Sequence, residues 1–202
     1  MFDQDGLWQL MEPYAHSAHE IVFRLSVVRG IAAELAAGGA ITTNCIDHEL
    51  ACLQVLIATE KLAAALASVH GVADREVLFE ADVSWSAIDH RAMLPMPIES
   101  MGDRYRLRPN DFIPPDEFRR LRDDAREALR LESLRPATDA IPVNAIGSAA
   151  DKLHDWLRSH MLIIRKFAGV ALLDLADDQF NCRLVSIDDI NWPGETWSGV
   201  RQ

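Results

Sequence analysis

The feature that most constrains this fold is a long apolar repeat at the start of the chain. Between positions 7 and 35 apolar residues recur in alternating steps of three and four: Leu7, Met11, Tyr14, Ala18, Ile21, Leu25, Val28, Ala32 and Leu35. At about 100° per residue, this spacing places every one of them on one face of an α-helix. The sequence therefore predicts a long amphipathic helix, with Pro13 in its first turn and Gly38-Gly39 at its end.

Three later segments repeat this helical pattern. The second begins at a cap on Thr43 or Asn44, ends at Gly71, and has a predicted inward seam through Ile46, Leu50, Leu53, Ile57, Glu60, Ala64 and Ala67. The third starts after Pro114-Pro115 and turns Phe118, Leu121, Ala125 and Leu129 inward. The fourth, capped at Ser148, is predicted through Ala150, Leu153, Leu157, Met161, Ile164, Ala168, Ala171 and Leu175, with Gly169 as a point of kinking or early termination.

Between the second and third helices the period changes to two. Apolar residues from Val77 to Trp85 alternate with polar ones, and Tyr105 and Leu107 alternate with arginines, which predicts two strands that pair as a small hairpin. The connection over 86–103 is predicted to be a binding or disordered loop, and a third short strand is expected at 182–187.

The predicted fold class is mainly α: an antiparallel four-helix bundle with a small β-hairpin or sheet excursion between helices 2 and 3. We expect one globular domain over 1–202. Its helical core covers about 7–70 and 115–176, its irregular or β insert about 72–113, and its C-terminal tail 188–202.

Charge limits the choice of partner. The chain has 20 Lys and Arg against 31 Asp and Glu, a formal net charge of −11, which opposes binding to nucleic acid or anionic lipid. We therefore expect a protein partner with a basic surface, or self-association, and neither a membrane nor nucleic acid. The acidic N-terminal residues and the three cysteines, an odd number, favour a cytoplasmic, reducing location.

Several residues that lack an obvious place in the core are predicted to contact that partner. They are His16, His19 and Phe23 on the outer face of the first helix, Met93 and Met96 in the Met- and Pro-rich loop, and Trp192 and Trp197 in the tail. Trp is common among interface anchors, but the tail is also expected to be able to dock onto its own bundle.

Catalytic patterns are weak in this sequence. It contains no Gly-x-Ser-x-Gly elbow, and its ten glycines do not provide a nucleotide-binding loop. No cofactor is predicted. The alternative is a metal-dependent helical-bundle enzyme or sensor, with ligands drawn from Glu60, His48, His154 and His160. The preferred prediction is a non-enzymatic binding or regulatory protein that acts through protein contacts, by analogy with small acidic bacterial adaptor, immunity or antitoxin proteins.

Overall fold

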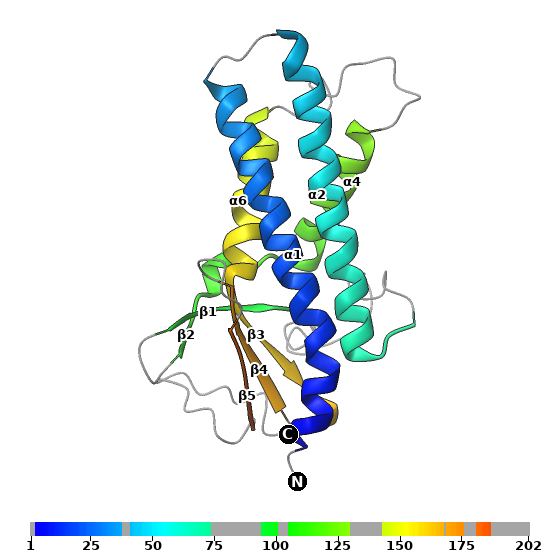
Figure 1. Cartoon of the computed structure of the whole chain (residues 1–202), viewed down its shortest axis with the longest axis vertical. Coiled ribbons are helices and arrows are strands. Elements are labelled where there is room, and N and C mark those ends of the chain that lie inside the picture. The colour runs from blue at the N-terminus through cyan, green and yellow to red at the C-terminus, as the bar shows by residue number, and fades with distance from the viewer. Residues whose placement is uncertain are drawn as a thin grey trace.

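Two long helices form the tallest part of the molecule (Figure 1). The computed structural model describes residues 3–37, 41–73, 94–100, 105–129, 143–167, 169–175 and 181–186. Helix α1 spans Gln4–Ala36 and begins at Asp3, whose side chain accepts a 2.9 Å hydrogen bond from the Gly6 amide. The helix therefore starts before Pro13, which lies inside it.

Helix α2, Ile41–His70, packs antiparallel beside α1 along its length (Figure 1). It ends at Gly71, as the sequence predicts. Gly71 has a φ of 65°, a left-handed conformation in which glycine carries no Cβ penalty. The turn is closed by a 2.9 Å hydrogen bond from the Val72 amide to the Ala67 carbonyl.

Two shorter helices support this pair. Helix α4, Pro115–Ala128, packs against α2 and buries Phe118 and Ala125, as its apolar spacing predicts. Helix α6, Val143–Arg158, packs against α1. Trp156 of α6 joins the layers, because its indole Nε1 donates a 2.7 Å hydrogen bond to the Pro95 carbonyl and its ring meets Phe118 edge-on.

The described strands form one antiparallel sheet in the order β2-β1-β3-β4-β5. Their bounds are Met96–Ser100 (β1), Tyr105–Leu107 (β2), Ser159–Ile164 (β3), Gly169–Asp174 (β4) and Asn181–Ser186 (β5). Short 3-10 turns at Pro109–Asp111 (η2) and Arg165–Phe167 (η3) connect neighbouring elements. The sheet lies at the N-terminal end of α1, below α6 (Figure 1).

The predicted four-helix bundle is therefore wrong: the fold is α/β, with four helices in the described residues and a five-stranded antiparallel sheet. The main error is the fourth helix, which ends at Arg158 and passes directly into β3 and β4. Residues 160–164 and 169–173 are buried without a break. Apart from His160, these runs hold only apolar residues and glycine. An apolar run of this kind fits the spacing of a helix as well as that of a strand, so the periodicity could not distinguish them.

Both faces of the sheet are buried, which explains those unbroken apolar runs. On one face Leu162, Ile164 and Leu173 join the core shared with the helices. On the other face Met161, Ile163, Val170 and Leu172 form a second cluster with Met96 and Ile98 of β1.

The smaller β predictions have mixed outcomes. The strands at Tyr105–Leu107 and near 182–187 are confirmed as β2 and β5. The loop predicted over 86–103 is wrong in part, because β1 occupies Met96–Ser100 and joins the apolar face of the sheet. The strand predicted at 77–85 lies outside the described residues, and the partner of β2 within them is β1.

Candidate functional site

The outer side of the α1–α2 pair carries large apolar side chains that face away from the core. On α1, Phe23 is 63% exposed and Val27 is 40% exposed. Both lie on the helix side opposite Ile21, Leu25 and Val28, which are buried. Phe23 was singled out from the sequence because it falls outside the apolar stripe, and the structure places it as predicted.

The neighbouring helix α2 adds three more exposed apolar residues. Ile46 is 67% exposed, and Leu50 and Leu53 are each about two-fifths exposed. The sequence assigned these residues to the inward seam, and that assignment is wrong. The buried stripe of α2 instead runs through residues such as Val55, Leu62 and Leu66. We call the set Phe23, Val27, Ile46, Leu50 and Leu53 the α1–α2 face.

Helix α2 is apolar on nearly all sides, which is unusual for a helix with one side open to solvent. Its segment Ile46–His70 is long and apolar enough to cross a membrane by length and composition alone, and half of the qualifying window is buried inside the chain. One side of that apolar surface packs on α1 and α4, and the other contributes to the α1–α2 face.

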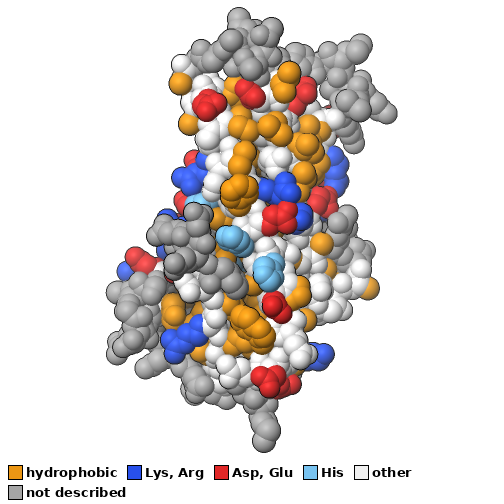
Figure 2. All heavy atoms as spheres, viewed as in Figure 1, with side chains coloured by type: hydrophobic (Ala, Val, Ile, Leu, Met, Phe, Trp, Pro, Cys, Tyr) orange, Lys and Arg blue, Asp and Glu red, His pale blue; other side chains and the backbone are white. Residues whose placement is uncertain are grey.

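A polar network borders the α1–α2 face toward the sheet. Glu20 accepts hydrogen bonds from Lys61, 2.5 Å away, and from Arg24, at 2.6 Å. Arg24 also donates to the Gln54 side chain across the helix pair at 2.7 Å. The hydrogen bonds from Lys61 and then Arg24 hold the pKa of Glu20 below its usual range. Figure 2 shows charged groups of both signs below a gathering of apolar side chains on this side of the molecule.

Carboxylates lie beside the apolar residues on both helices of the face. Glu34 is exposed and lies seven residues, two helical turns, beyond Val27 on α1. Glu49 is exposed and lies between Ile46 and Leu53 at the i+3 and i−4 spacings that make helical neighbours. The face therefore has an apolar centre with an acidic flank.

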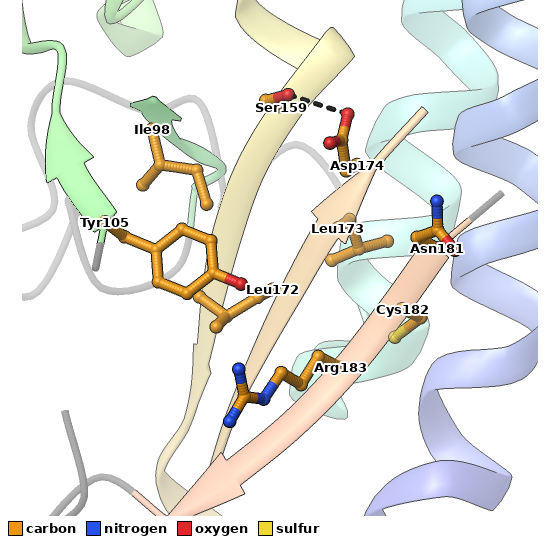
Figure 3. Close-up of a pocket in the computed structure, with 9 residues that line it drawn as sticks. All are labelled: Ile98, Tyr105, Ser159, Leu172, Leu173, Asp174, Asn181, Cys182 and Arg183. Atoms are coloured by element: carbon orange, nitrogen blue, oxygen red, sulfur yellow. Dashed lines mark hydrogen bonds between the residues drawn. The ribbon is translucent and has the colours of Figure 1, made fainter. Parts of the chain in front are cut away.

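A second candidate site is a cavity of about 250 Å³ beside the second face of the sheet. Its lining includes Tyr105 of β2, Ser159 of β3, Asp174 of β4, and Asn181 and Arg183 of β5. Figure 3 shows the Tyr105 ring reaching toward Leu172, with Arg183 to one side and the Ser159–Asp174 pair to the other. Ser159 donates a 3.0 Å hydrogen bond to Asp174.

Both ring nitrogens of the buried His160 have hydrogen-bond partners inside the protein. Its Nε2 lies 2.9 Å from the Tyr14 hydroxyl, and its Nδ1 lies 2.8 Å from the Leu157 carbonyl. In a neutral ring, Nδ1–H donates to the carbonyl and Nε2 accepts from the phenol. Burial lowers the pKa of His160 to about 4 and raises the pKa of Tyr14 above its ordinary value. His160 lies on β3, so its two ring nitrogens connect that strand to the end of α6 and to α1.

The other residues of the metal alternative have separate surroundings. Glu60 is 2.5 Å from Arg126 of α4, and the Nδ1 of His154 is 3.2 Å from Arg29 of α1. His48 is buried with its Nδ1 3.8 Å from the Cys52 sulfur. In the described part of the chain, no three His, Cys, Asp or Glu residues are close enough together to hold a metal.

The remaining predicted contact residues fall in three situations. His16 is exposed and His19 half-exposed on α1, on the side of the polar network below Phe23. Met96 is only 5% exposed, because it packs into the sheet rather than lying on an open loop. Met93, Trp192 and Trp197 lie outside the described residues.

Comparison with known proteins finds no match to a family model, to a curated protein or to a solved structure.

Sequence reasoning missed the α2 half of the face and the whole cavity. The signal for α2 was present: a second apolar stripe lies opposite Val55 and Leu62 on the same helix. The cavity gave no local signal, because its polar residues come from four separate strands and meet only through the sheet register.

Proposed function

We propose that this protein is a non-enzymatic binding protein that docks an amphipathic helix of a protein partner on the α1–α2 face, and that basic residues flank the apolar stripe of that helix. The observation that carries the proposal is the group of five large apolar side chains exposed across two adjacent helices. Contiguous exposed apolar patches of this kind, rimmed by polar groups, are typical of protein interaction sites.

The shape of the surface suits a helix as its occupant. Two parallel ridges of side chains, Phe23 and Val27 on α1 and Ile46, Leu50 and Leu53 on α2, run along neighbouring helices. An apolar stripe with residues at i, i+3, i+4 and i+7 can pack along such ridges. Phe23 is the most exposed aromatic residue of the face and is the expected anchor.

Charge favours a basic partner over a second copy of the chain. Glu34 and Glu49 flank the apolar centre, and the whole chain carries −11. A two-fold dimer brings the same patch of both copies into one interface, so two acidic chains would meet there. Lys61 and Arg24, two basic groups that border the face, already contact Glu20. Basic residues on a different partner would instead complement the acidic flank and speed encounter.

Charge also argues against a lipid surface, although α2 is strongly apolar. Anionic lipid attracts basic clusters, and this face has an acidic flank. A protein helix supplies the apolar contact without requiring Glu34 and Glu49 to approach lipid phosphates.

The test uses two synthetic helical peptides of about 18 residues, five turns in length. Both carry the same leucine stripe, one with lysine and arginine flanks and the other with glutamate flanks. Fluorescence anisotropy with the full chain is expected to show saturable binding of the basic peptide, at least about tenfold tighter than the acidic one, a difference of about 1.4 kcal/mol. Leu50→Gln combined with Leu53→Gln should weaken that binding by about tenfold or more.

Trp8→Gln is the matched control, since Trp8 is an exposed apolar residue of α1 outside the α1–α2 face. It should leave peptide binding unchanged. Equal binding of the two peptides, or equal loss in the control, would overturn the proposal. Sedimentation tests whether a second copy of the chain occupies the face, and vesicle flotation tests whether a membrane does. A dimer that the double glutamine variant abolishes would replace the basic partner with a second copy. Adhesion to phosphatidylglycerol vesicles that the same variant abolishes would replace it with a membrane.

A further inference from the structure

We propose that the cavity beside the second face of the sheet binds a small zwitterion, an α-amino acid with an apolar side chain. Asp174 would receive the ammonium group and Arg183 the carboxylate. This site is distinct from the α1–α2 face, and the inference does not rest on the docking proposal.

The first observation is a row of polar side chains across three strands. In the sheet register Ser159 pairs with Asp174, and Asp174 pairs with Asn181. Paired residues project from the same face, so these three side chains lie side by side at one end of the face that carries the second apolar cluster. The hydrogen bond from Ser159 orients the Asp174 carboxylate, and a carboxylate can accept about four such bonds in total.

The second observation is the place of Arg183. It pairs with Leu172 in the register, one row beyond the polar row and on the same face. Asp174 and Arg183 are therefore diagonal neighbours on adjacent strands, with backbone positions about 7–8 Å apart. The two side chains project into the same cavity from neighbouring rows, so one short ligand can offer an ammonium group to Asp174 and a carboxylate to Arg183.

The third observation is the apolar lining between the two charges. Ile98, Leu172 and the ring of Tyr105 line the cavity, and Figure 3 shows that ring lying between Arg183 and the Ser159–Asp174 pair. At about 250 Å³ the cavity is slightly smaller than most drug-binding pockets, which favours a ligand of amino-acid size.

The charges of the lining select against simpler ligands. An anion without a positive group would meet Asp174, and a cation without a negative group would meet Arg183. Cys182 pairs with Leu173 in the register, so its side chain projects from the opposite face, toward the core shared with the helices, and does not face the ligand. Recognition is therefore non-covalent.

Three matched probes test this assignment on the full chain by isothermal titration calorimetry. L-leucine carries both charges, L-leucinamide lacks the carboxylate, and N-acetyl-L-leucine lacks the ammonium. L-leucine is expected to bind saturably, with a dissociation constant of about 1 mM or lower. Each of the other two should bind at least about tenfold more weakly. Amide shifts caused by L-leucine should centre on β4, β5 and Tyr105.

Two charge-removing variants assign the charges, and a third serves as the control. Asp174→Asn keeps an acceptor for Ser159, and Arg183→Gln keeps a long polar side chain, yet each should weaken L-leucine binding by about tenfold or more. Arg106→Gln changes an exposed arginine of β2 adjacent to Tyr105 and should have no effect. No saturable binding of L-leucine or L-phenylalanine up to about 10 mM would overturn the inference. Equal binding of the three leucine probes would overturn it as well.

Discussion

The buried pair of Tyr14 and His160 makes the pH dependence of stability predictable. His160 is fully buried, and burial lowers its pKa to about 4, while the hydrogen bond to the Leu157 carbonyl opposes that shift. In the unfolded chain the imidazole has its ordinary pKa of about 6.5. Between those two values the unfolded state binds more protons than the folded state, so the free energy of unfolding falls as the pH falls.

The magnitude follows from the size of this shift. A difference of about 2.5 pKa units corresponds to about 3 kcal/mol, fully lost only below pH 4. Between pH 7 and pH 5 the expected loss from His160 alone is about 2 kcal/mol. When Nε2 is protonated, the Tyr14 hydroxyl can rotate to accept a hydrogen bond from it, so that hydrogen bond is kept. The loss of stability therefore comes from the cost of burying the charge of the imidazolium ring.

Urea unfolding at pH 7 and pH 5 measures this loss in the wild type and in His160→Gln. The variant is expected to be less stable at pH 7, and its further loss on going to pH 5 should be smaller than that of the wild type by about 2 kcal/mol. Subtracting the stability loss of the variant from that of the wild type removes the contributions of the other histidines, because both proteins contain them. Equal losses in both proteins, or a ¹⁵N ring spectrum showing His160 protonated at pH 5.5, would refute the reasoning.

Three further substitutions test the packing. Gly30→Ala should raise the free energy of unfolding by about 0.5–1 kcal/mol in thermal or urea denaturation, because a Cβ there meets open space in the middle of α1. Gly6→Ala should instead lower stability, because its Cβ would come within 2.5 Å of the Asp3 carboxylate that caps the helix. Trp156→Phe should cost about 2–4 kcal/mol in urea titrations, since it removes the hydrogen bond to Pro95 and leaves a void beside the ring. If Trp156→Phe leaves the free energy of unfolding unchanged, the indole contact contributes little to stability.

The helices were the most predictable part of the fold. The spacing of apolar residues identified α1, α2 and α4, and Gly71 marked the end of α2, because helix periodicity and a left-handed terminus are local properties. The strands β3 and β4 were not predictable by the same means. Both of their faces are buried, so their sequences carry no alternation.

The candidate sites divide in the same way. Phe23 was recognised because it interrupts a clear amphipathic pattern on α1. On α2 the sequence offered two apolar stripes, and the one chosen as inward proved to be exposed at Ile46, Leu50 and Leu53, although Ala67 near its end is buried. Glu60 therefore does not enter the core, and it meets Arg126 at the edge of α2 instead.

The sequence by itself determined where long helices form, where they stop, and that the chain is strongly acidic, since these depend on neighbouring residues and on composition. Only the tertiary structure decided which stripe of α2 faces inward, because two stripes of similar apolarity compete and packing against α1 and α4 selects one. It also decided that Ser159, Asp174 and Arg183 line one cavity, because strand register brings together residues that no local pattern connects.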